Sequence, residues 1–527
     1  MTTSAMKWSA IAAARRVLAG EQGPVVRDWG GRLPIALVYP NTYRVGMSSL
    51  ALHTLYAAFN RAPDVVCERV FCGLRSVETG DAPLSLESQH ELGDFSVLAV
   101  SFSFELDYLN WTTLLRRAGL PVLARERGDG DALVLAGGPA VTANPEPLAD
   151  VCDAFVIGEV EPVLDRLLDA LRLLLSERRE QVLDALAAIP GIYVPGRSRS
   201  VERQVCSNLD ASPTQTVIYT DNTEFGDMHL MEIARGCGHG CRFCLAGCVY
   251  RPRRERSPAV LLDQARQARG QRSKVGLVSA AVSDYSRLDE LLRGLAELEM
   301  QVAVSSLRVD PLPTALLKAL AASRTRTLTL APEAGSERLR THIRKGITAA
   351  DIQNAAEAAT RYGFPELKLY FMIGLPTEEE DDIEAIAATL DAVATSYRGR
   401  LSASVAAFVP KAHTPFERSA MATEDTLRCR LKRLRALLRL RGVRLSADGI
   451  PWSVVQAVLA RGDRQLGAVL ADLREPSLGE WKRAMAAHRL ADADYTGAFS
   501  ADECLPWAHI RLNQAMRVAR EENHGLD

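Results

Sequence analysis

Two blocks of alternating β-type and helical segments constrain the fold of this chain more than any other feature of its sequence. In the first block, short apolar runs rich in β-branched residues alternate with stretches of helical periodicity. The β-type runs are residues 34–39, 97–102, 133–136 and 154–157, and the helical stretches are residues 48–60, 108–118 and a long amphipathic stretch that ends at residue 186. This alternation predicts an open, doubly wound parallel sheet with helices on both faces.

The second block contains six further β-type runs, and helical stretches separate most of them. The runs are residues 230–233, 275–278, 301–305, 327–330, 367–373 and 404–409. Six β/α units in about 200 residues are typical of part of a barrel of parallel strands. We therefore expect a partial (β/α)6 TIM-type barrel, whose working face is the ring of loops that follow the strands.

These patterns divide the 527-residue chain into four expected parts. Residues 1–195 are expected to form a Rossmann-like domain with an N-terminal lead-in. A linker is expected over residues 196–225, where periodicity is lost and Pro, Ser, Thr and Asn accumulate. Residues 226–444 correspond to the partial barrel, and residues 445–527 to a small helical C-terminal extension.

Composition excludes several classes of protein. The formal charge of −2, from 63 basic and 65 acidic residues, provides no global attraction to nucleic acid or to an anionic membrane. Ten cysteines are too sparse for a disulfide scaffold, and charges within the first thirty residues argue against a secretory signal. The most apolar helical stretch, residues 163–175, contains four charged residues. We expect a cytoplasmic protein with no membrane span and no nucleic-acid partner.

Four of the ten cysteines fall within twelve positions, just after the first strand of the second block. Cys237, Cys241 and Cys244 have the spacing C-x3-C-x2-C, and Cys248 follows four residues later. Interleaved glycines allow the backbone to fold so that thiolates converge on one centre. Thiolates select zinc, copper(I) or an iron–sulfur cluster.

Three interpretations of this cysteine group are open. A closed zinc site would use Cys248 as its fourth ligand, although structural zinc usually takes two C-x2-C-like pairs separated by a longer loop. A fully ligated electron-transfer cluster is the second interpretation. In the third, Cys237, Cys241 and Cys244 hold a [4Fe–4S] cluster and leave one iron free to bind a substrate or cofactor.

The cysteine spacing, with Phe243 before the last cysteine and a position on the first loop of a predicted β/α barrel, resembles the radical S-adenosylmethionine (SAM) superfamily. The resemblance implies that the three cysteines ligate a [4Fe–4S] cluster whose open iron chelates the amino and carboxylate groups of SAM. It also implies reductive cleavage of SAM to a 5′-deoxyadenosyl radical, with an electron donor such as flavodoxin or ferredoxin. Cys248 is then a structural thiol.

The following strand ends supply candidate SAM contacts under this resemblance. Residues 279–285 stand where many members carry a Gly-Gly-Glu stretch that holds the SAM amino group, and Arg308 offers a cation suited to a carboxylate. Residues 332–336 resemble the family's Pro-Glu-x-Gly-Ser segment, although a helix cap at Ser336 accounts for part of it equally well. Residues 370–378 resemble the stretch that packs on adenine. The SAM-binding candidates are Ser283, Asp284, Ser305, Arg308, Glu333, Ser336, Tyr370 and Gly374.

A doubly wound domain ahead of such a barrel resembles the cobalamin-binding (B12-binding) subset of the superfamily. In familiar cobalamin domains the loop after the first strand is Asp-x-His-x-x-Gly, whereas residues 41–46 are Asn-Thr-Tyr-Arg-Val-Gly here. A bound cobalamin is therefore expected to lack a histidine lower ligand, and a vestigial or nucleotide-binding domain is the alternative. The candidate cobalamin contacts are Asn41, Tyr43, Gly46, Ser101, Ser103, Gly137, Gly138, Gly158 and Glu159.

The resemblance covers most of the chain, as far as residues 505–510, and points to a bacterial subfamily with a predicted B12-binding domain and an unassigned reaction. We expect a radical SAM enzyme that is cobalamin-dependent. If methylcobalamin is the bound form, the expected outcome is methyl transfer to an unactivated carbon, and a rearrangement or a ring-forming radical reaction is the other outcome that the sequence leaves open. The alternatives are a non-catalytic corrinoid or iron–sulfur binding protein, and an RNA-modifying radical SAM enzyme. For the latter, the basic run of residues 251–256 offers a local patch, which a solvated surface segment would also carry. No motif identifies the substrate or a catalytic residue beyond these cofactor contacts.

Overall fold

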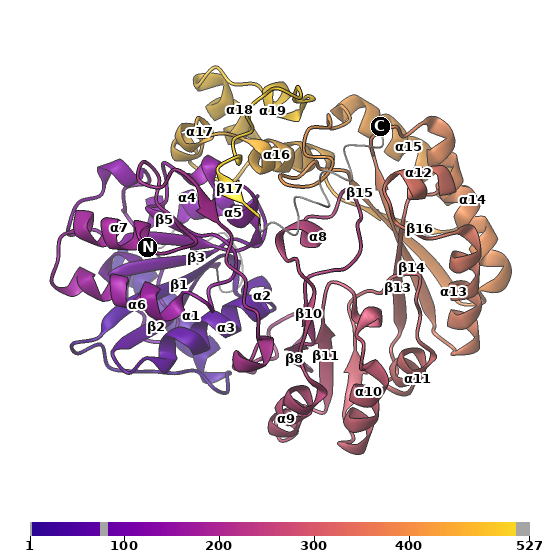
Figure 1. Ribbon diagram of the computed structural model, residues 1–527, viewed down its shortest axis with the longest axis horizontal. Coiled ribbons are helices and arrows are strands. Elements are labelled where there is room, and N and C mark those ends of the chain that lie inside the picture. Colours follow the sequence, from indigo (N-terminus) through magenta and orange to yellow (C-terminus); the bar gives the residue numbers. More distant parts are fainter. Residues whose placement is uncertain (1–2, 74–82, 513–527) are drawn as a thin grey trace. The chain divides into compact units, whose positions relative to one another are not determined.

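The computed structural model describes residues 3–73 and 83–512, and they divide into two compact units (Figure 1). The first unit comprises the described residues up to Gly226, with Leu459–Asp494 and the described residues from Cys504 onward. The second unit comprises Asp227–Val458 and Tyr495–Glu503. The division at residue 226 falls at the end of the expected linker, and the C-terminal residues are shared between the two units.

The first unit contains one six-stranded sheet in the order β2-β1-β3-β4-β5-β6. All neighbouring strands are parallel except β5 and β6, which are antiparallel. The order 2-1-3-4-5 is a doubly wound order in which the winding direction reverses between β1 and β3. The expected parallel α/β sheet is therefore confirmed. The strands are β1 (Leu33–Thr42), β2 (Val65–Gly73), β3 (Val97–Ser101), β4 (Leu133–Gly137), β5 (Ala154–Val156) and β6 (Ile192–Tyr193).

Both faces of this sheet are buried, because alternate residues of a strand point to opposite faces. On β1, Ile35 and Leu37 belong to an apolar cluster with helices α3 (Leu50–Arg61) and α6 (Leu164–Arg172). Ala36 and Val38 are equally buried on the other face. Helix α4 (Asp107–Arg117) also contacts β1. The other helices that precede the C-terminal segment are α1 (Thr3–Ala19), α2 (Tyr43–Gly46), α5 (Pro139–Ala143) and α7 (Arg179–Ala187).

Strand β2 is not predicted by the sequence pattern. Its centre carries Glu68 and Arg69, which interrupt an otherwise apolar run, yet both residues are buried. The Arg69 guanidinium lies 2.6 Å from a carboxylate oxygen of Glu21 and 2.7 Å from one of Glu87. Glu21 and Glu87 lie outside β2. The sequence of the strand therefore does not show that the charge of Arg69 is compensated.

The C-terminal residues of the first unit pack over the segment that follows β4. The Asn144 side chain donates hydrogen bonds to the carbonyl oxygens of Ala460 and Gly462, at 3.3 and 2.8 Å. A Cβ at Gly467, in helix α17 (Leu466–Asp472), would lie 3.1 Å from Asp150. The remaining elements of this unit are α18 (Leu478–Ala487) and the parallel pair β7 (Val201–Glu202) and β17 (Ile510–Arg511), whereas α19 (Asp492–Thr496) crosses the boundary between the units.

The second unit contains two parallel sheets, in the orders β12-β11-β8 and β13-β14-β15-β16. A parallel bridge between Leu307 and Leu330 lies between the two sheets. All six expected runs form strands, and β16 adds a seventh; because one bridge links the sheets, the partial barrel stays a prediction. The strands are β8 (His229–Glu232), β11 (Lys274–Val278), β12 (Gln301–Ala303), β13 (Thr327–Glu333), β14 (Glu366–Ile373), β15 (Arg400–Ala407) and β16 (Arg444–Ala447).

Helices pack on one face of these sheets. Alternate residues of β14, such as Leu367 and Leu369, are buried in a core shared with these helices, whereas Lys368 and Tyr370 are half-buried on the opposite face. The helices of this core are α9 (Pro258–Ala268), α10 (Leu288–Glu297), α11 (Thr314–Ala322), α13 (Ala349–Arg361), α14 (Glu380–Ser396) and α15 (Glu424–Leu440). The shorter elements are β9 (Ala234–Arg235), β10 (Arg254–Glu255), α8 (Ala246–Val249) and α12 (Glu337–His342), and α16 (Ile450–Arg461) crosses the unit boundary. Across the described ranges, we find no helix of the length and apolar character that crossing a membrane requires.

Candidate functional site

The loop that carries the cysteine motif connects β9 to α8 in the second unit. Gly236 begins it with a φ of +85°, and a Cβ there would lie 2.3 Å from the carbonyl oxygen of Tyr250. A side chain is excluded at this position by both conformation and space. Gly238 and Gly240 differ, because no described atom lies within 4 Å of the point where their Cβ would stand. Of the interleaved glycines predicted to shape the loop, Gly236 is the one that the backbone requires.

Cys237, Cys241 and Cys244 are half-buried free thiols, and the first two lie near enough to Cys244 to act on its charge. Burial raises the pKa of the Cys244 thiol, and negative charge on Cys241 and Cys237 raises it further, whereas backbone N–H groups of Gly247 and Ala246 lower it. Cys248 is buried at 8% exposure in α8. In residues 3–73 and 83–512, no three His, Cys, Asp or Glu side chains meet closely enough to hold a single metal ion. Three accessible thiols, with N–H groups directed at one of them, fit the thiolate donor set of an iron–sulfur cluster.

Arg308 lies beside this thiol group. Its Nη1 is 4.0 Å from Sγ of Cys241, and its Nη2 donates a hydrogen bond to the carbonyl oxygen of Lys345 at 2.9 Å. The Lys345 ammonium is 2.9 Å from the Glu333 carboxylate and 6.0 Å from the centre of the Phe243 ring. Arg308 and Glu333, both predicted from the sequence, are thus linked through Lys345, which the sequence pattern does not single out.

Glu333 has a φ of +71°, an unusual conformation for a residue other than glycine. Two further residues with positive φ, Thr377 (+64°) and His413 (+64°), follow the next two strands, β14 and β15. Such conformations cost of order 1–3 kcal/mol each and cluster at functional sites. Three consecutive strand ends of the second unit therefore carry strained backbone on the side where the candidate residues lie.

Asp284 and Ser283 follow β11 in a short 3-10 turn, Val282–Asp284. A carboxylate oxygen of Asp284 is 2.6 Å from Nε2 of His239, inside the cysteine loop. The Ser283 hydroxyl is buried and makes no hydrogen bond within the described residues, which is typical of a group that awaits a ligand or water. Ser305 is exposed after β12. The structure thus brings Asp284 to the cysteine loop and leaves Ser305 at the surface.

Ser336, Tyr370 and Gly374 complete the predicted SAM set. The Ser336 hydroxyl caps α12 by accepting a hydrogen bond from the N–H of Leu339 and donates one to Asp382, so its structural role is realised. Tyr370 is half-buried, with the Lys368 ammonium 5.2 Å from its ring centre. The backbone N–H of Gly374 donates to Glu378 at 2.6 Å. The buried carboxylate of Glu378 therefore holds the loop after β14, a role that the sequence pattern does not predict.

Glu378 is itself an unusual group. Burial raises its pKa to about 7, although the Gly374 N–H and the Arg430 guanidinium, 2.8 Å away, lower it. Arg430 comes from α15 and also donates to the Glu378 carbonyl oxygen at 2.8 Å. The loop after β14 therefore depends on an ion pair with that helix.

The basic run of residues 251–256 is largely engaged in contacts inside the second unit. Arg251 donates to the carbonyl oxygen of His239 at 2.8 Å, and Arg253 donates to that of Asp284. Arg256 is 1% exposed and lies 2.7 Å from Glu232 of β8. Arg254 donates to the carbonyl oxygens of Tyr250 and Pro252. These arginines fix the cysteine loop and its surroundings.

In the first unit, Asn41 and Ser103 lie at the reversal between β1 and β3, where doubly wound sheets bind ligands. The Asn41 amide donates to the Asp107 carboxylate at 2.8 Å, and Asn110 donates to the same oxygen at 3.3 Å. Burial raises the pKa of Asp107 to about 7, and these two hydrogen bonds lower it. Ser103 is exposed and hydrogen-bonds Tyr39, whose pKa is raised by burial. Asp107 and Tyr39 were not predicted from the sequence.

The other candidates of the first unit are mostly packed against protein. Tyr43 is fully buried, and its hydroxyl donates to Glu21 at 2.6 Å. A Cβ at Gly46 would lie 2.4 Å from the Phe71 ring, and one at Gly138, which has a φ of +107°, would lie 2.4 Å from the Phe102 carbonyl oxygen. Glu159 is buried and accepts a hydrogen bond from the N–H of Cys206.

Three more candidates, Ser101, Gly137 and Gly158, also lie at strand ends. Ser101 is buried at the end of β3 and pairs with Gly137, the last residue of β4. Gly158 has a φ of +100°, and a Cβ there would lie 2.4 Å from the Gln204 carbonyl oxygen. The structure therefore brings Asn41 and Ser103 together at the strand reversal, whereas tight packing explains the three glycines at positions 46, 138 and 158.

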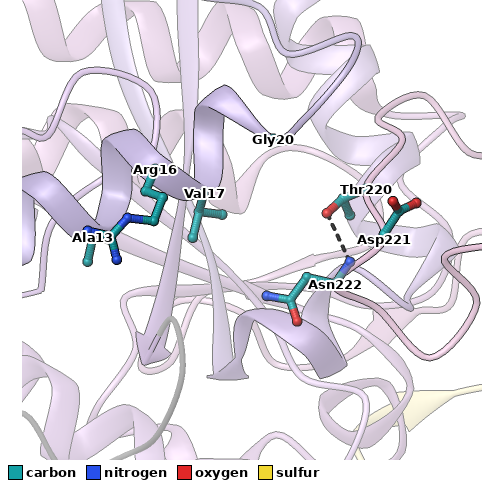
Figure 2. Close-up of a pocket in the computed structure, with 7 residues that line it drawn as sticks. All are labelled: Ala13, Arg16, Val17, Gly20, Thr220, Asp221 and Asn222. Carbon is teal, nitrogen blue, oxygen red and sulfur yellow. Dashed lines mark hydrogen bonds between the residues drawn. The ribbon is translucent and has the colours of Figure 1, made fainter.

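Figure 2 shows a pocket of about 330 Å³ elsewhere in the first unit. It lies between the end of α1, which contributes Arg16 and Val17, and the segment of residues 220–222. Between two of its lining residues, the Thr220 hydroxyl accepts a hydrogen bond from the N–H of Asn222 at 3.2 Å. None of the predicted site residues lines this pocket.

Comparison with known proteins gives the family. Residues 231–390 match the model of the radical SAM superfamily, and residues 51–195 match the model described as radical SAM proteins, N-terminal. The uncharacterized protein MJ0966 of Methanocaldococcus jannaschii is 30% identical over 451 residues, which cover 84% of this chain and 92% of that protein. The chain belongs to the radical SAM superfamily and is a radical SAM enzyme; the family implies a [4Fe–4S] cluster and SAM.

Similarity to solved structures is found at low sequence identity. The cobalamin-dependent SAM radical enzyme OxsB, with aqua-cobalamin and SAM bound, matches with a TM-score of 0.50 and 13% identity over 94% of this chain and 72% of that chain. With aqua-cobalamin alone, OxsB matches over 68% of this chain and 52% of that chain, with 15% identity and a TM-score of 0.47. Streptococcus suis SuiB bound to SAM matches with a TM-score of 0.31 and 15% identity, over 42% of this chain and 50% of that chain. The chain thus spans about half the length of the last two structures.

Proposed function

We propose that the second unit cleaves SAM reductively at a [4Fe–4S] cluster held by Cys237, Cys241 and Cys244. The observation that carries this proposal is the shared neighbourhood of the three thiols, with the Arg308 guanidinium 4.0 Å from Cys241. A cation at that distance is suited to the carboxylate of a ligand bound next to the cluster. A bound cluster, reduced by an external one-electron donor such as flavodoxin or ferredoxin, would supply the electron that breaks the 5′ C–S bond of SAM, which gives a 5′-deoxyadenosyl radical and methionine.

The residues around the thiols have distinct parts in this proposal. Arg308 binds the SAM carboxylate, and the Glu333 carboxylate, held in place by Lys345, accepts hydrogen bonds from the amino group or the ribose hydroxyls. The buried Ser283 hydroxyl offers a further polar contact. Gly374 presents its backbone to the adenine, because Glu378 fixes the loop from behind. Together these groups orient SAM and exclude water from it.

We further propose that the first unit binds cobalamin at the reversal between β1 and β3. Support comes from the strand order, from the polar groups of Asn41 and Ser103, and from two exposed apolar residues that follow the same strands, Val45 (40% exposed) and Phe104 (41% exposed). Apolar side chains beside a few polar groups are typical of small-molecule sites. Bound methylcobalamin would supply a methyl group, and methyl transfer to an unactivated carbon is the reaction we assign to the enzyme.

The test uses full-length protein produced with cobalamin, purified and reconstituted without oxygen, and then reduced in the presence of SAM. We expect 5′-deoxyadenosine to form and the isolated protein to show corrinoid absorbance. Cys241→Ala should abolish cleavage, whereas Cys248→Ala is the matched control and should retain both the cluster and cleavage. Retained cleavage with an intact cluster in Cys241→Ala would refute the ligand assignment.

The same experiment separates the alternatives. Cleavage without corrinoid would make the first unit a substrate or partner module. A well-formed cluster without cleavage would favour a non-catalytic corrinoid or iron–sulfur binding protein. Action on RNA receives little support, because the arginines of residues 251–256 are engaged in contacts within the protein.

A further inference from the structure

His239 and Asp284 form a contact that the proposed SAM site does not require. Nε2 of His239 lies 2.6 Å from a carboxylate oxygen of Asp284, and the side chains are 31% and 16% exposed. His239 stands between Cys237 and Cys241, whereas Asp284 follows β11. The His239 side chain therefore connects the cysteine loop to the segment that follows β11.

The backbone of His239 is held as well. Its carbonyl oxygen accepts a hydrogen bond from Arg251 at 2.8 Å. On another side, a Cβ at Gly247 would lie 3.4 Å from the same oxygen, so α8 packs closely against it. Gly238 and Gly240, on either side of His239, have open space around them. His239 is thus the point at which this part of the loop is fixed.

The segment that follows Asp284 is anchored to residues 255–256 and, through Arg256, to β8. The hydroxyl of its neighbour Tyr285 donates to the carbonyl oxygen of Arg256 at 2.6 Å. The guanidinium of Arg256 in turn lies 2.7 Å from Glu232 of β8. The N–H of Ser286 donates to Glu255 at 3.1 Å. The two residues that follow Asp284 are thus both held in place, and they fix the segment that presents Asp284 to His239.

We propose that His239 and Asp284 are positioning residues, which hold the loop between Cys237 and Cys241 and thereby set how firmly the cluster is retained and how readily it is reduced. This inference rests on the proposed cluster site. Partners of this kind orient the groups that ligate a metal, and their loss typically costs about 10- to 100-fold in metal affinity or activity. A carboxylate near the cluster also disfavours the addition of an electron, since charge and hydrogen bonds around a cluster tune its potential.

The experiment compares Asp284→Asn, His239→Ala and the double variant with wild-type protein reconstituted to the same iron content. Iron release to a chelator, without SAM or reductant, measures retention, and a redox titration followed by electron paramagnetic resonance measures the midpoint potential. We expect each single variant to release iron about 10- to 100-fold faster and the double variant to be no worse than either single one. The midpoint potential should rise in Asp284→Asn and fall in His239→Ala, where the carboxylate loses its partner.

Three controls separate positioning from general damage. His488→Ala breaks another His–Asp pair, with Asp472 at 2.8 Å in the first unit, and should leave retention and potential unchanged. His239→Gln keeps a side-chain donor for Asp284 and should restore part of the retention. Thermal unfolding of the cluster-free variants should match that of cluster-free wild-type protein.

Two results would overturn the inference. The first is that iron release and potential are both unchanged in the two single variants. The second is that Asp284→Asn weakens SAM binding while His239→Ala has no effect on any readout, since Asp284 would then be a direct SAM ligand. A wild-type protein that takes up no cluster at all would instead contradict the proposed function itself.

Discussion

The Arg308 guanidinium lies 4.0 Å from the Cys241 thiol, although 67 positions separate the two residues in the chain. Arg308 follows β12, whereas Cys241 belongs to the loop between β9 and α8, so the contact exists only because both loops meet at one edge of the second unit. Lys345 adds a third segment, because its carbonyl oxygen accepts a hydrogen bond from Arg308 while its ammonium pairs with Glu333. Contacts within the protein thus hold both cations, the Arg308 guanidinium next to the Cys241 thiol and the Lys345 ammonium next to Glu333, where they would face an anionic ligand.

Gly236→Ala should impair cluster retention, and Gly238→Ala should not. A methyl group at Gly236 would meet the Tyr250 carbonyl oxygen at 2.3 Å in a backbone conformation with φ at +85°, whereas one at Gly238 would meet no described atom within 4 Å. We expect Gly236→Ala to lower the iron content after reconstitution several-fold, since strain of about 1–3 kcal/mol must be relieved by moving the loop. Iron and sulfide analysis of both variants checks this, and equal iron content would contradict it.

Arg430→Met should raise the KM for SAM, because it removes the cation beside Glu378 and so loosens the loop of Gly374. Burial already raises the pKa of Glu378 to about 7, and loss of Arg430 would raise it further and leave a protonated, weaker acceptor for the Gly374 N–H. Arg433→Met, which breaks an exposed pair with Glu384, is the control. We expect a several-fold higher KM with little change in kcat for Arg430→Met alone, measured as 5′-deoxyadenosine formation. An unchanged KM would show that this loop does not touch SAM.

Local patterns predicted much of this architecture, whereas long-range pairs did not show in the sequence. The six strand positions of the second unit and the cysteine spacing depend on residues close together in the chain, so sequence patterns predict them. The role of Lys345 follows from its contacts with Glu333 and Arg308, which are distant in the chain from one another. The role of Asp107 likewise follows from its hydrogen bonds with Asn41 and Asn110. Strand β2 was missed because the burial of Arg69 depends on Glu21, 48 positions away.

Strand-end glycines show a second limit of sequence patterns. Gly46 and Gly138 stand where a cofactor contact was predicted, and each is needed because Phe71 or the Phe102 backbone fills the space of a Cβ. A glycine at a strand end is equally well explained by a ligand or by a neighbouring chain segment. The sequence alone cannot separate these causes, since the neighbour lies elsewhere in the chain.

Arg69→Met should destabilise the first unit strongly. The Arg69 side chain and the carboxylates of Glu21 and Glu87 are all fully buried, so the substitution would leave two buried negative charges without a cation. Breaking such a buried network costs about 3–5 kcal/mol. Arg44→Met is the control, because its pair with Glu224 is about half exposed and solvent screening leaves such a pair little effect on stability. Denaturant unfolding followed by circular dichroism measures both, and similar losses in the two variants would contradict the prediction.

Asp107→Asn should change how stability depends on pH. Burial raises the pKa of Asp107 to about 7, so in the folded protein this carboxyl keeps its proton at pH values where the unfolded chain has lost it. The folded state then binds more protons, and Asp107 makes the free energy of unfolding fall as pH rises from about 4 to 7. Because each pKa unit corresponds to about 1.4 kcal/mol, the stability of Asp107→Asn relative to wild type should increase by up to a few kcal/mol between pH 5 and pH 8.

Urea unfolding of the two proteins at pH 5 and pH 8 checks this prediction, with Asp64→Asn as the control. The pKa of Asp64 is lowered by its hydrogen bond to Arg172, so this carboxylate is ionised in both the folded and the unfolded state between pH 5 and pH 8. Its replacement should shift stability equally at the two pH values. A pH-independent difference for Asp107→Asn as well would mean that Asp107 is ionised in the folded protein at pH 5. The hydrogen bonds from Asn41 and Asn110 would then outweigh the effect of its burial.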